Sequence, residues 1–135
     1  PHSVLVRCRD TAGNWGTAQK IDTEDLGDAS IPQIAMDASG NAVVAWEQFD
    51  GTRFSIGANR YDASRSAWGA ATLNQTDAGE ARSPQIAVDA SGNAIAVCIN
   101  ATPQSVSYKS IWRNATASGT DRIAVGNILL MRKLS

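Results

Sequence analysis

The sequence predicts an all-β protein built from a repeated antiparallel unit. The first observation is an internal repeat: residues 32–42 read PQIAMDASGNA and residues 84–94 read PQIAVDASGNA, so ten of eleven positions match at a spacing of 52 residues. A period of about 50 residues is typical of stacked supersecondary units. The second observation is that Gly, Pro, Asn and Asp interrupt the chain at short intervals, and no helical periodicity runs between them.

Four short strands are expected in the complete copy of the repeat, over residues 33–36, 42–48, 53–61 and 68–74. Between the first two strands, Asp37 and Gly40 fit a type I turn followed by a left-handed residue. Glycine supplies the positive φ there without a Cβ penalty. Asp50-Gly51 predicts the next hairpin, and residues 62–67 form a polar loop before the fourth strand.

Four antiparallel strands in about 52 residues match the pattern of a β-propeller blade. The chain ends are out of phase with the repeat. Ser3–Asp10 is expected to be a third strand, because it corresponds to Ser55–Asp62 at the same spacing of 52, and Trp15 corresponds to Trp68 at 53. One repeat domain over residues 1–135 is therefore expected, as a half blade at 1–24, a full blade at 31–76, a degenerate blade at 83–127 and a divergent tail at 128–135. Residues 121–127 are expected to form the degenerate fourth strand of the last blade.

The composition is that of a folded chain of one-domain size, with 135 residues, 43% hydrophobic and 19% charged. A net charge of −1 gives no electrostatic reason to expect a nucleic-acid partner. The longest apolar run, residues 94–99, is too short to span a bilayer, so no membrane partner is expected. The first residues lack the apolar core and basic flank of an export signal.

The string DASGNAVVAWEQFDG, followed by ANRYDA and Trp68-Gly69, resembles the repeat of bacterial β-propeller proteins of largely unassigned function. It is also loosely similar to the sialidase-like and fucose-lectin-like propellers. The resemblance implies a propeller fold and an exported or extracellular location. The spacing from Asp37 to Gly40 is one residue longer than in the sialidase aspartate box, so the similarity is one of turn style.

Roughly two and a half blades are fewer than the about four to eight that close a propeller. An open stack would expose a strand edge and the apolar faces of its end blades. The phase of the termini favours closure by association of chains, which predicts a homo-oligomer. Two alternatives stay open: the chain is a piece of a longer protein, or the blades fold as a small sandwich capped by the tail.

Trp46, Glu47, Arg53 and Arg60 lie on adjacent expected strands and form the candidate ligand site. Fucose-binding propellers resemble this in using Arg, Glu and Trp together. A Trp face packs against sugar C–H groups, while Arg and Glu hydrogen-bond to hydroxyls. The opposing interpretation is that Trp46 is core and the charges are a solvated rim. The third copy favours the latter, because Cys98 replaces Trp46 there.

The other aromatic and ligand-forming residues predict structure more than chemistry. Trp15 and Trp68 open the fourth strand in two copies and are expected to anchor packing, with stacking on a ligand ring as the alternative. His2 is the only histidine, and each Asp turn has a single carboxylate, so no metal and no cofactor are expected. Cys8 and Cys98 are expected to be free and partly buried thiols, because free cysteine is common in protein interiors.

The sequence therefore predicts a non-catalytic binding or interaction module, with carbohydrate as the ligand class. The first alternative is a structural or protein-interaction part of a larger exported propeller. The second is a glycosidase-type enzyme, since glycosidases need only a pair of carboxylates. No catalytic residue is predicted, because the chain has no nucleophile elbow, phosphate loop or metal-ligand spacing.

Overall fold

The computed structural model describes residues 1–22, 27–73, 79–101, 106–110, 124–125 and 128–129, with side chains up to residue 99. This part of the chain is all-β and contains no helix. The strands are β1 (Leu5–Val6), β2 (Gln19–Lys20), β3 (Ala29–Met36), β4 (Ala42–Phe49), β5 (Phe54–Asp62), β6 (Ala67–Trp68), β7 (Thr72–Leu73), β8 (Glu80–Val88), β9 (Ala94–Ala101), β10 (Val106–Ser110), β11 (Ala124–Val125) and β12 (Ile128–Leu129).

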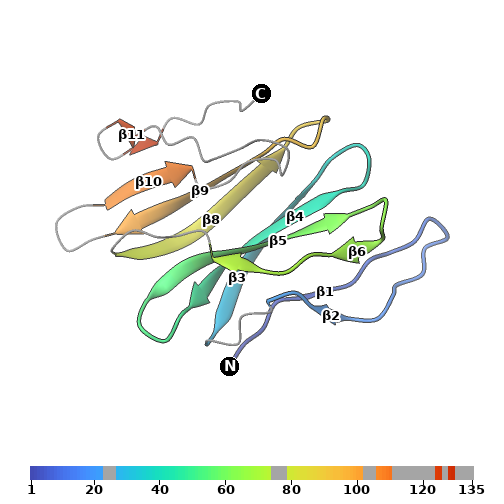
Figure 1. Ribbon diagram of the computed structural model, residues 1–135, viewed down its shortest axis with the longest axis horizontal. Helices are drawn as coiled ribbons and strands as arrows, with labels where there is room; N and C mark the ends of the chain where they lie inside the picture. The colour runs from blue at the N-terminus through green and yellow to red at the C-terminus, as the bar shows by residue number, and fades with distance from the viewer. Residues whose placement is uncertain (23–26, 74–78, 102–105, 111–123, 126–127, 130–135) are drawn as a thin grey trace.

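All the strand pairs are antiparallel and form four sheets. The central sheet has the order β3-β4-β5-β6, and β7 pairs with β5 as well. A second sheet has the order β10-β9-β8, and β1-β2 and β11-β12 form two-stranded pairs. The sheets follow one another across the molecule in chain order (Figure 1). None of the described sheets closes on itself.

The sequence repeat reappears as a repeated strand geometry. In β3 the pairing register shifts between Ser30 and Gln33, and β8 has the same irregularity 52 residues later. In both strands the residue before the proline has a positive φ, 50° at Ile31 and 53° at Ser83. Proline within a sheet is confined to edges and bulges. Pairing with β4 continues on the N-terminal side of the bulge, so β3 begins at Ala29 and not at Gln33 as predicted.

The repeated DASGN turn is held by one carboxylate. Asp37 accepts hydrogen bonds from the Ser39 and Asn41 backbone N–H groups at 2.8 and 2.9 Å, and from Asn41 Nδ2 at 2.8 Å. Asp89 accepts the same three bonds in its own turn, at 2.9, 2.9 and 2.8 Å. Gly40 has the predicted positive φ, at 86°. The Asn41 side chain is the main reason that the pKa of Asp37 is lowered.

Two apolar clusters lie on opposite faces of the central sheet, because successive side chains of a strand point to opposite sides. One cluster faces β1 and β2; its buried members are Val4, Ile21, Ala29, Val44, Trp46 and Ala71. The other faces β8 and β9; its buried members are Ala45, Ile56, Ala58, Ala81, Ala96 and Cys98. Each sheet thus packs against the next along the chain.

Several predicted strands are shorter or interrupted. The strand expected over Ser3–Asp10 is regular only at Leu5–Val6, and the fourth strand expected over 68–74 is split into β6 and β7. The stretch 121–127, predicted as a fourth strand, contributes β11, which pairs with β12 of the tail. The rest of 111–135 lies outside the described residues. Neither Cys8 nor Cys98 forms a disulfide, as predicted; Cys98 is buried, whereas Cys8 is exposed and the burial predicted for it is wrong.

Candidate functional site

Trp46, the aromatic residue of the predicted ligand site, is a core residue with 1% of its surface exposed. Its indole Nε1 donates a hydrogen bond to Gln48 Oε1 at 3.0 Å. The ring lies over Gly57, its cross-strand partner, where a Cβ would come within 2.6 Å of the indole. Gly57 thus leaves room for the ring, and no face of Trp46 is open to a ligand.

Glu47 points to the opposite face from Trp46 and joins the central sheet to β8. Arg82 Nη1 donates to Glu47 Oε2 at 2.9 Å, and the Ser83 backbone N–H donates to Glu47 Oε1 at 2.8 Å. The Arg82 guanidinium also stacks on Phe54, 3.5 Å from the ring centroid. The Glu47 carboxylate is buried, and its described hydrogen-bond partners are intramolecular.

Arg53 and Arg60, the remaining predicted site residues, lie at opposite ends of β5. Arg53 sits 3.8 Å from Asp50 at the β4–β5 hairpin, and Arg60 lies near the β5–β6 turn. The structure therefore does not bring the four predicted residues together in one place. Trp46 and Glu47 are neighbours on one strand, so their divergence follows from the two-residue period of a strand.

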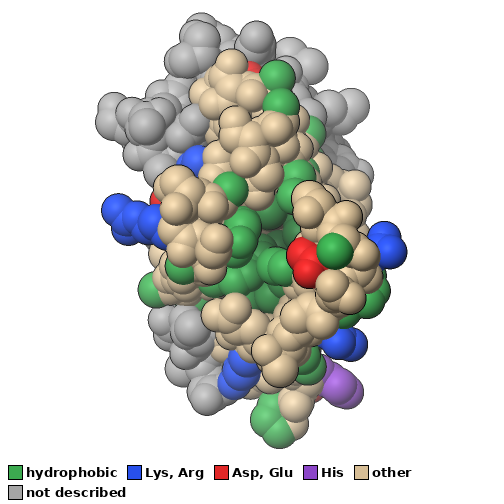
Figure 2. Space-filling view, turned by 90° about the vertical axis from the view of Figure 1, so that its right-hand side faces the viewer, with side chains coloured by type: hydrophobic (Ala, Val, Ile, Leu, Met, Phe, Trp, Pro, Cys, Tyr) green, Lys and Arg blue, Asp and Glu red, His purple; other side chains and the backbone are tan. Residues whose placement is uncertain are grey.

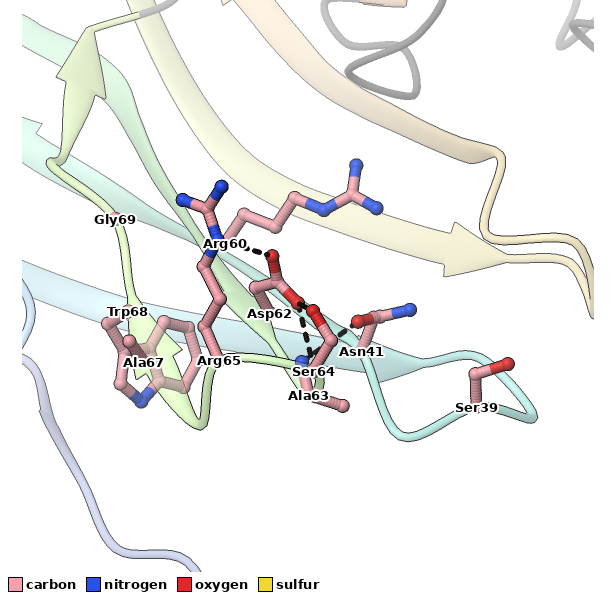
Figure 3. A pocket seen from close by; sticks show the side chains of 10 residues that line it. All are labelled: Ser39, Asn41, Arg60, Asp62, Ala63, Ser64, Arg65, Ala67, Trp68 and Gly69. Carbon is pink, nitrogen blue, oxygen red and sulfur yellow. Dashed lines mark hydrogen bonds and ion pairs between the residues drawn. The ribbon is translucent and has the colours of Figure 1, made fainter.

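A groove lies at the end of the molecule where the β3–β4 and β5–β6 turns meet. It has a volume of about 720 Å³, and its lining includes Asn41, Arg60, Asp62, Arg65 and Trp68 (Figure 3). The two turns are tied together by a hydrogen bond from the Ala63 N–H to Asn41 Oδ1 at 2.9 Å. Seen from the right-hand side of Figure 1, the molecule shows hydrophobic side chains gathered in a hollow (Figure 2).

The polar side of the groove is organised by Asp62. Its Oδ1 accepts hydrogen bonds from the Ser64 hydroxyl at 2.6 Å and from the Ser64 N–H at 2.9 Å. Arg65 Nε lies 3.6 Å from Asp62 Oδ2. The hydrogen bond from the Ser64 side chain is the largest cause that lowers the pKa of Asp62. Asp62 is therefore ionised at neutral pH and fixed as an acceptor beside two arginines.

The apolar side of the groove is Trp68. Its ring is partly buried and packs against Tyr61, with centroids 5.4 Å apart and planes tilted by 50°. The packing role predicted for Trp68 is confirmed, since it contacts the cluster that faces β1 and β2. The same prediction is wrong for Trp15, which is 59% exposed. The groove thus offers one aromatic surface beside charged and neutral hydrogen-bonding groups.

Sequence reasoning missed Asp62 and Arg65 as groove residues, because residues 62–67 were predicted only as a polar loop, and it favoured packing over ligand stacking for Trp68. The available signal was topological: in antiparallel hairpins every second turn lies at the same end of the sheet. The β3–β4 and β5–β6 turns therefore had to be neighbours, and Arg60 and Trp68 flank the second of them.

The described residues contain no group of three or more His, Cys, Asp or Glu side chains placed to hold a metal ion. The described part of the chain has no helix long and apolar enough to cross a membrane. Comparisons with protein-family models, with curated proteins and with solved structures find no match to this chain.

Proposed function

We propose that the chain is a non-catalytic binding module that takes a carbohydrate in the groove at the turn end. The observation that carries this proposal is the Trp68 ring set beside Arg60, Arg65 and Asp62 on one lining. An aromatic surface covers the apolar face of a sugar ring, and fixed charged and amide groups exchange hydrogen bonds with its hydroxyls. Of the four residues predicted from sequence, Arg60 alone belongs to this groove.

We further propose that the β sheets are blades of a β-propeller. Support comes from equivalent positions: Gly16 N–H donates to the Cys8 carbonyl at 2.9 Å, and Gly69 N–H donates to the Arg60 carbonyl at 2.9 Å. Cys8 and Arg60 are 52 residues apart, and Gly16 and Gly69 are 53 residues apart. We also propose that copies of the chain associate to close the propeller, as the phase of the repeat in the sequence predicts. The molar mass in solution tests it, and a monomer at all concentrations would count against it.

A glycosidase-type function is less well supported by the groove. Hydrolysis in most glycosidases uses two carboxyl groups, one of which is a protonated acid with a raised pKa. Asp62 is the one carboxylate in the described lining of the groove. Its pKa is lowered, so it is suited to accept hydrogen bonds and unsuited to donate a proton. A binding role agrees better with this arrangement than catalysis does.

A glycan array followed by calorimetry on the best ligand tests the proposal. Trp68→Ala and Arg60→Ala should each weaken binding by at least about tenfold, equivalent to about 1.4 kcal/mol. Trp15→Ala is the matched control, because Trp15 holds the corresponding position in the first repeat and does not line the groove. Absence of binding to any glycan, or equal losses in Trp15→Ala and Trp68→Ala, would overturn the carbohydrate assignment.

The second candidate function is a protein-interaction or structural element. It is favoured by exposed large hydrophobic side chains that do not line the groove, among them Leu5, Ile34 and Met36. Exposed apolar side chains that gather on one surface mark interaction sites in soluble proteins. Because these residues do not line the carbohydrate groove, either function can hold without the other.

A further inference from the structure

Strand β1 is paired along one edge only in the part of the chain that the structure describes. Leu5 and Val6 pair with Lys20 and Gln19 of β2, and no other described strand pairs with β1. An unpaired strand edge presents a row of backbone N–H and C=O groups to any chain that can pair with it.

The equivalent strand in the central sheet has both edges filled. In β5, Gly57 and Ala58 pair with β7, and these residues follow Leu5 and Val6 by 52 positions. The β1–β2 pair therefore repeats the β5–β7 pair in the same register. The other edge of β5 is filled by β4, with Trp46 opposite Gly57. The free edge of β1 is thus the place that a strand of the β4 type would occupy.

The backbone of β1 is oriented for such a partner. The Val4 carbonyl accepts a hydrogen bond from Ile21 N–H at 3.1 Å, and the Cys8 carbonyl accepts one from Gly16 N–H at 2.9 Å. Even-numbered residues therefore direct their backbone groups toward the β2 side. Backbone groups alternate along a strand, so those of Leu5 and Arg7 point to the free edge.

The space beside this edge is a groove of about 250 Å³ between β1 and the β3–β4 hairpin, whose lining includes Leu5, Pro32 and Ile34. Leu5 is 62% exposed and Ile34 is 57% exposed. One repeat later, the same face is covered: Pro84 is fully buried, and Ile86 packs against the cluster shared with β4 and β5. The covering element there is the complete sheet that includes the β3–β4 hairpin.

We infer that the free edge of β1 and its groove are a docking site for a strand–turn–strand hairpin with the chain's own repeat sequence. The hairpin would add its second strand to β1 through the backbone of Leu5 and Arg7. Its turn would be the DASGN turn, and its apolar face would cover Pro32 and Ile34, as the central sheet covers Pro84 and Ile86.

The partner at this edge is a polypeptide with an unpaired hairpin of this type, and any association between copies of this chain uses another surface. Both repeat hairpins of the chain are already paired on the edge in question, β4 by β5 and β9 by β10. A second copy would have to release one of these strands before β1 could take its place. A separate hairpin binds without that cost.

The test uses the whole chain and a fluorescein-labelled synthetic peptide with the sequence of residues 29–49. Saturable binding is expected, and it should protect the Leu5 and Arg7 amides from hydrogen exchange. Leu5→Pro removes an N–H on the free edge and spares the pairs with β2, so binding should fall at least tenfold. Leu5→Ala is the matched control: it keeps the N–H and should retain most of the binding.

Ile34→Lys provides a second variant if Leu5→Pro does not fold, because Ile34 is exposed and its replacement leaves the core intact. It should also weaken binding at least tenfold. Failure of the peptide to bind, or equal binding by Leu5→Pro, Ile34→Lys and the parent chain, would overturn the inference. A dimer of the parent chain that Leu5→Pro converts to monomer would overturn it as well, since a second copy would then hold the edge.

Discussion

The β3–β4 and β8–β9 hairpins have nearly the same sequence, yet different sheets pack against them. The β8–β9 hairpin faces a complete sheet, whereas the β3–β4 hairpin faces the short β1–β2 pair. The residue at the equivalent covered position differs in size: Trp46 under the short pair and Cys98 under the complete sheet. The larger side chain, Trp46, therefore lies where the sheet packed against the hairpin is smaller.

This comparison separates what is set locally from what is set by neighbours. The turn, the bulge and the strand register are the same in both hairpins. Burial differs between equivalent residues, as at Pro32 and Pro84. Local hydrogen bonds therefore determine the shape of the hairpin, and the adjacent sheet determines which of its residues become core.

Trp46→Ala should have the largest effect on stability. Removal of a fully buried tryptophan costs about 3–5 kcal/mol, and the cover over Trp46 is too small to collapse into the cavity. Cys98→Ala, at the equivalent position, removes one sulfur atom and should cost about 1 kcal/mol. Urea denaturation measures both. Equal losses in the free energy of unfolding would contradict a difference in packing between the two positions.

The two equivalent isoleucines should respond differently to truncation. Ile86→Ala should destabilise the fold by about 2 kcal/mol, since Ile86 packs against a buried cluster. Ile34→Ala should cost at most about 0.5 kcal/mol, because Ile34 is exposed. Both variants can be compared in one set of urea titrations. A large loss at Ile34 would mean that its groove is filled in solution.

Arg82→Ala tests the contact that joins β8 to the central sheet. It leaves the buried Glu47 carboxylate with the Ser83 N–H as its described partner, at a cost of about 1–2 kcal/mol. Part of the guanidinium is open to solvent, which keeps the loss below that of a fully buried pair. Ser30→Ala is the matched control at the equivalent position of β3. Thermal unfolding should show little change for it.

The smallest effect is the acid sensitivity of the turns. The pKa of Asp37 is lowered from its usual 3.8, first by the Asn41 side chain. A lowered pKa in the folded state contributes stability above the unfolded pKa, and this is lost as the pH falls through the folded value. Melting temperatures should therefore drop below about pH 4. Asn41→Ala should shrink this drop, and an unchanged pH profile would refute the link.

The fold was predictable where short-range chemistry decides it. The Asp and Gly of the repeated turn fix a hairpin through hydrogen bonds within five residues, so strands β4 and β5 lie within a residue or two of their expected bounds. The bulge at Ile31 was not predictable from apolar pattern, because it depends on the backbone around a proline. Regular fourth strands were also overestimated, since β6 and β7 are interrupted.

The candidate site was less predictable than the fold. Residue types alone suggested Trp46 and Glu47, but adjacent residues of a strand face opposite sides of the sheet. In the structure, Trp46 lies in the core and Glu47 binds Arg82 of the next sheet. Which face lies under a neighbouring sheet depends on tertiary packing. The groove of Arg60 and Trp68 depends on two turns that meet in space although they are 20 residues or more apart in sequence.

The Glu47–Arg82 pair has a consequence for how the chain folds. Near-identical hairpins can stack in the wrong order, a known hazard of repeat proteins. Glu47 is replaced by Ile99 in the next repeat, and Arg82 is replaced by Ser30 in the previous one. A stack in the wrong order would bury the Glu47 charge without its arginine, which is strongly unfavourable. One ion pair therefore gives otherwise interchangeable units a fixed sequence of assembly.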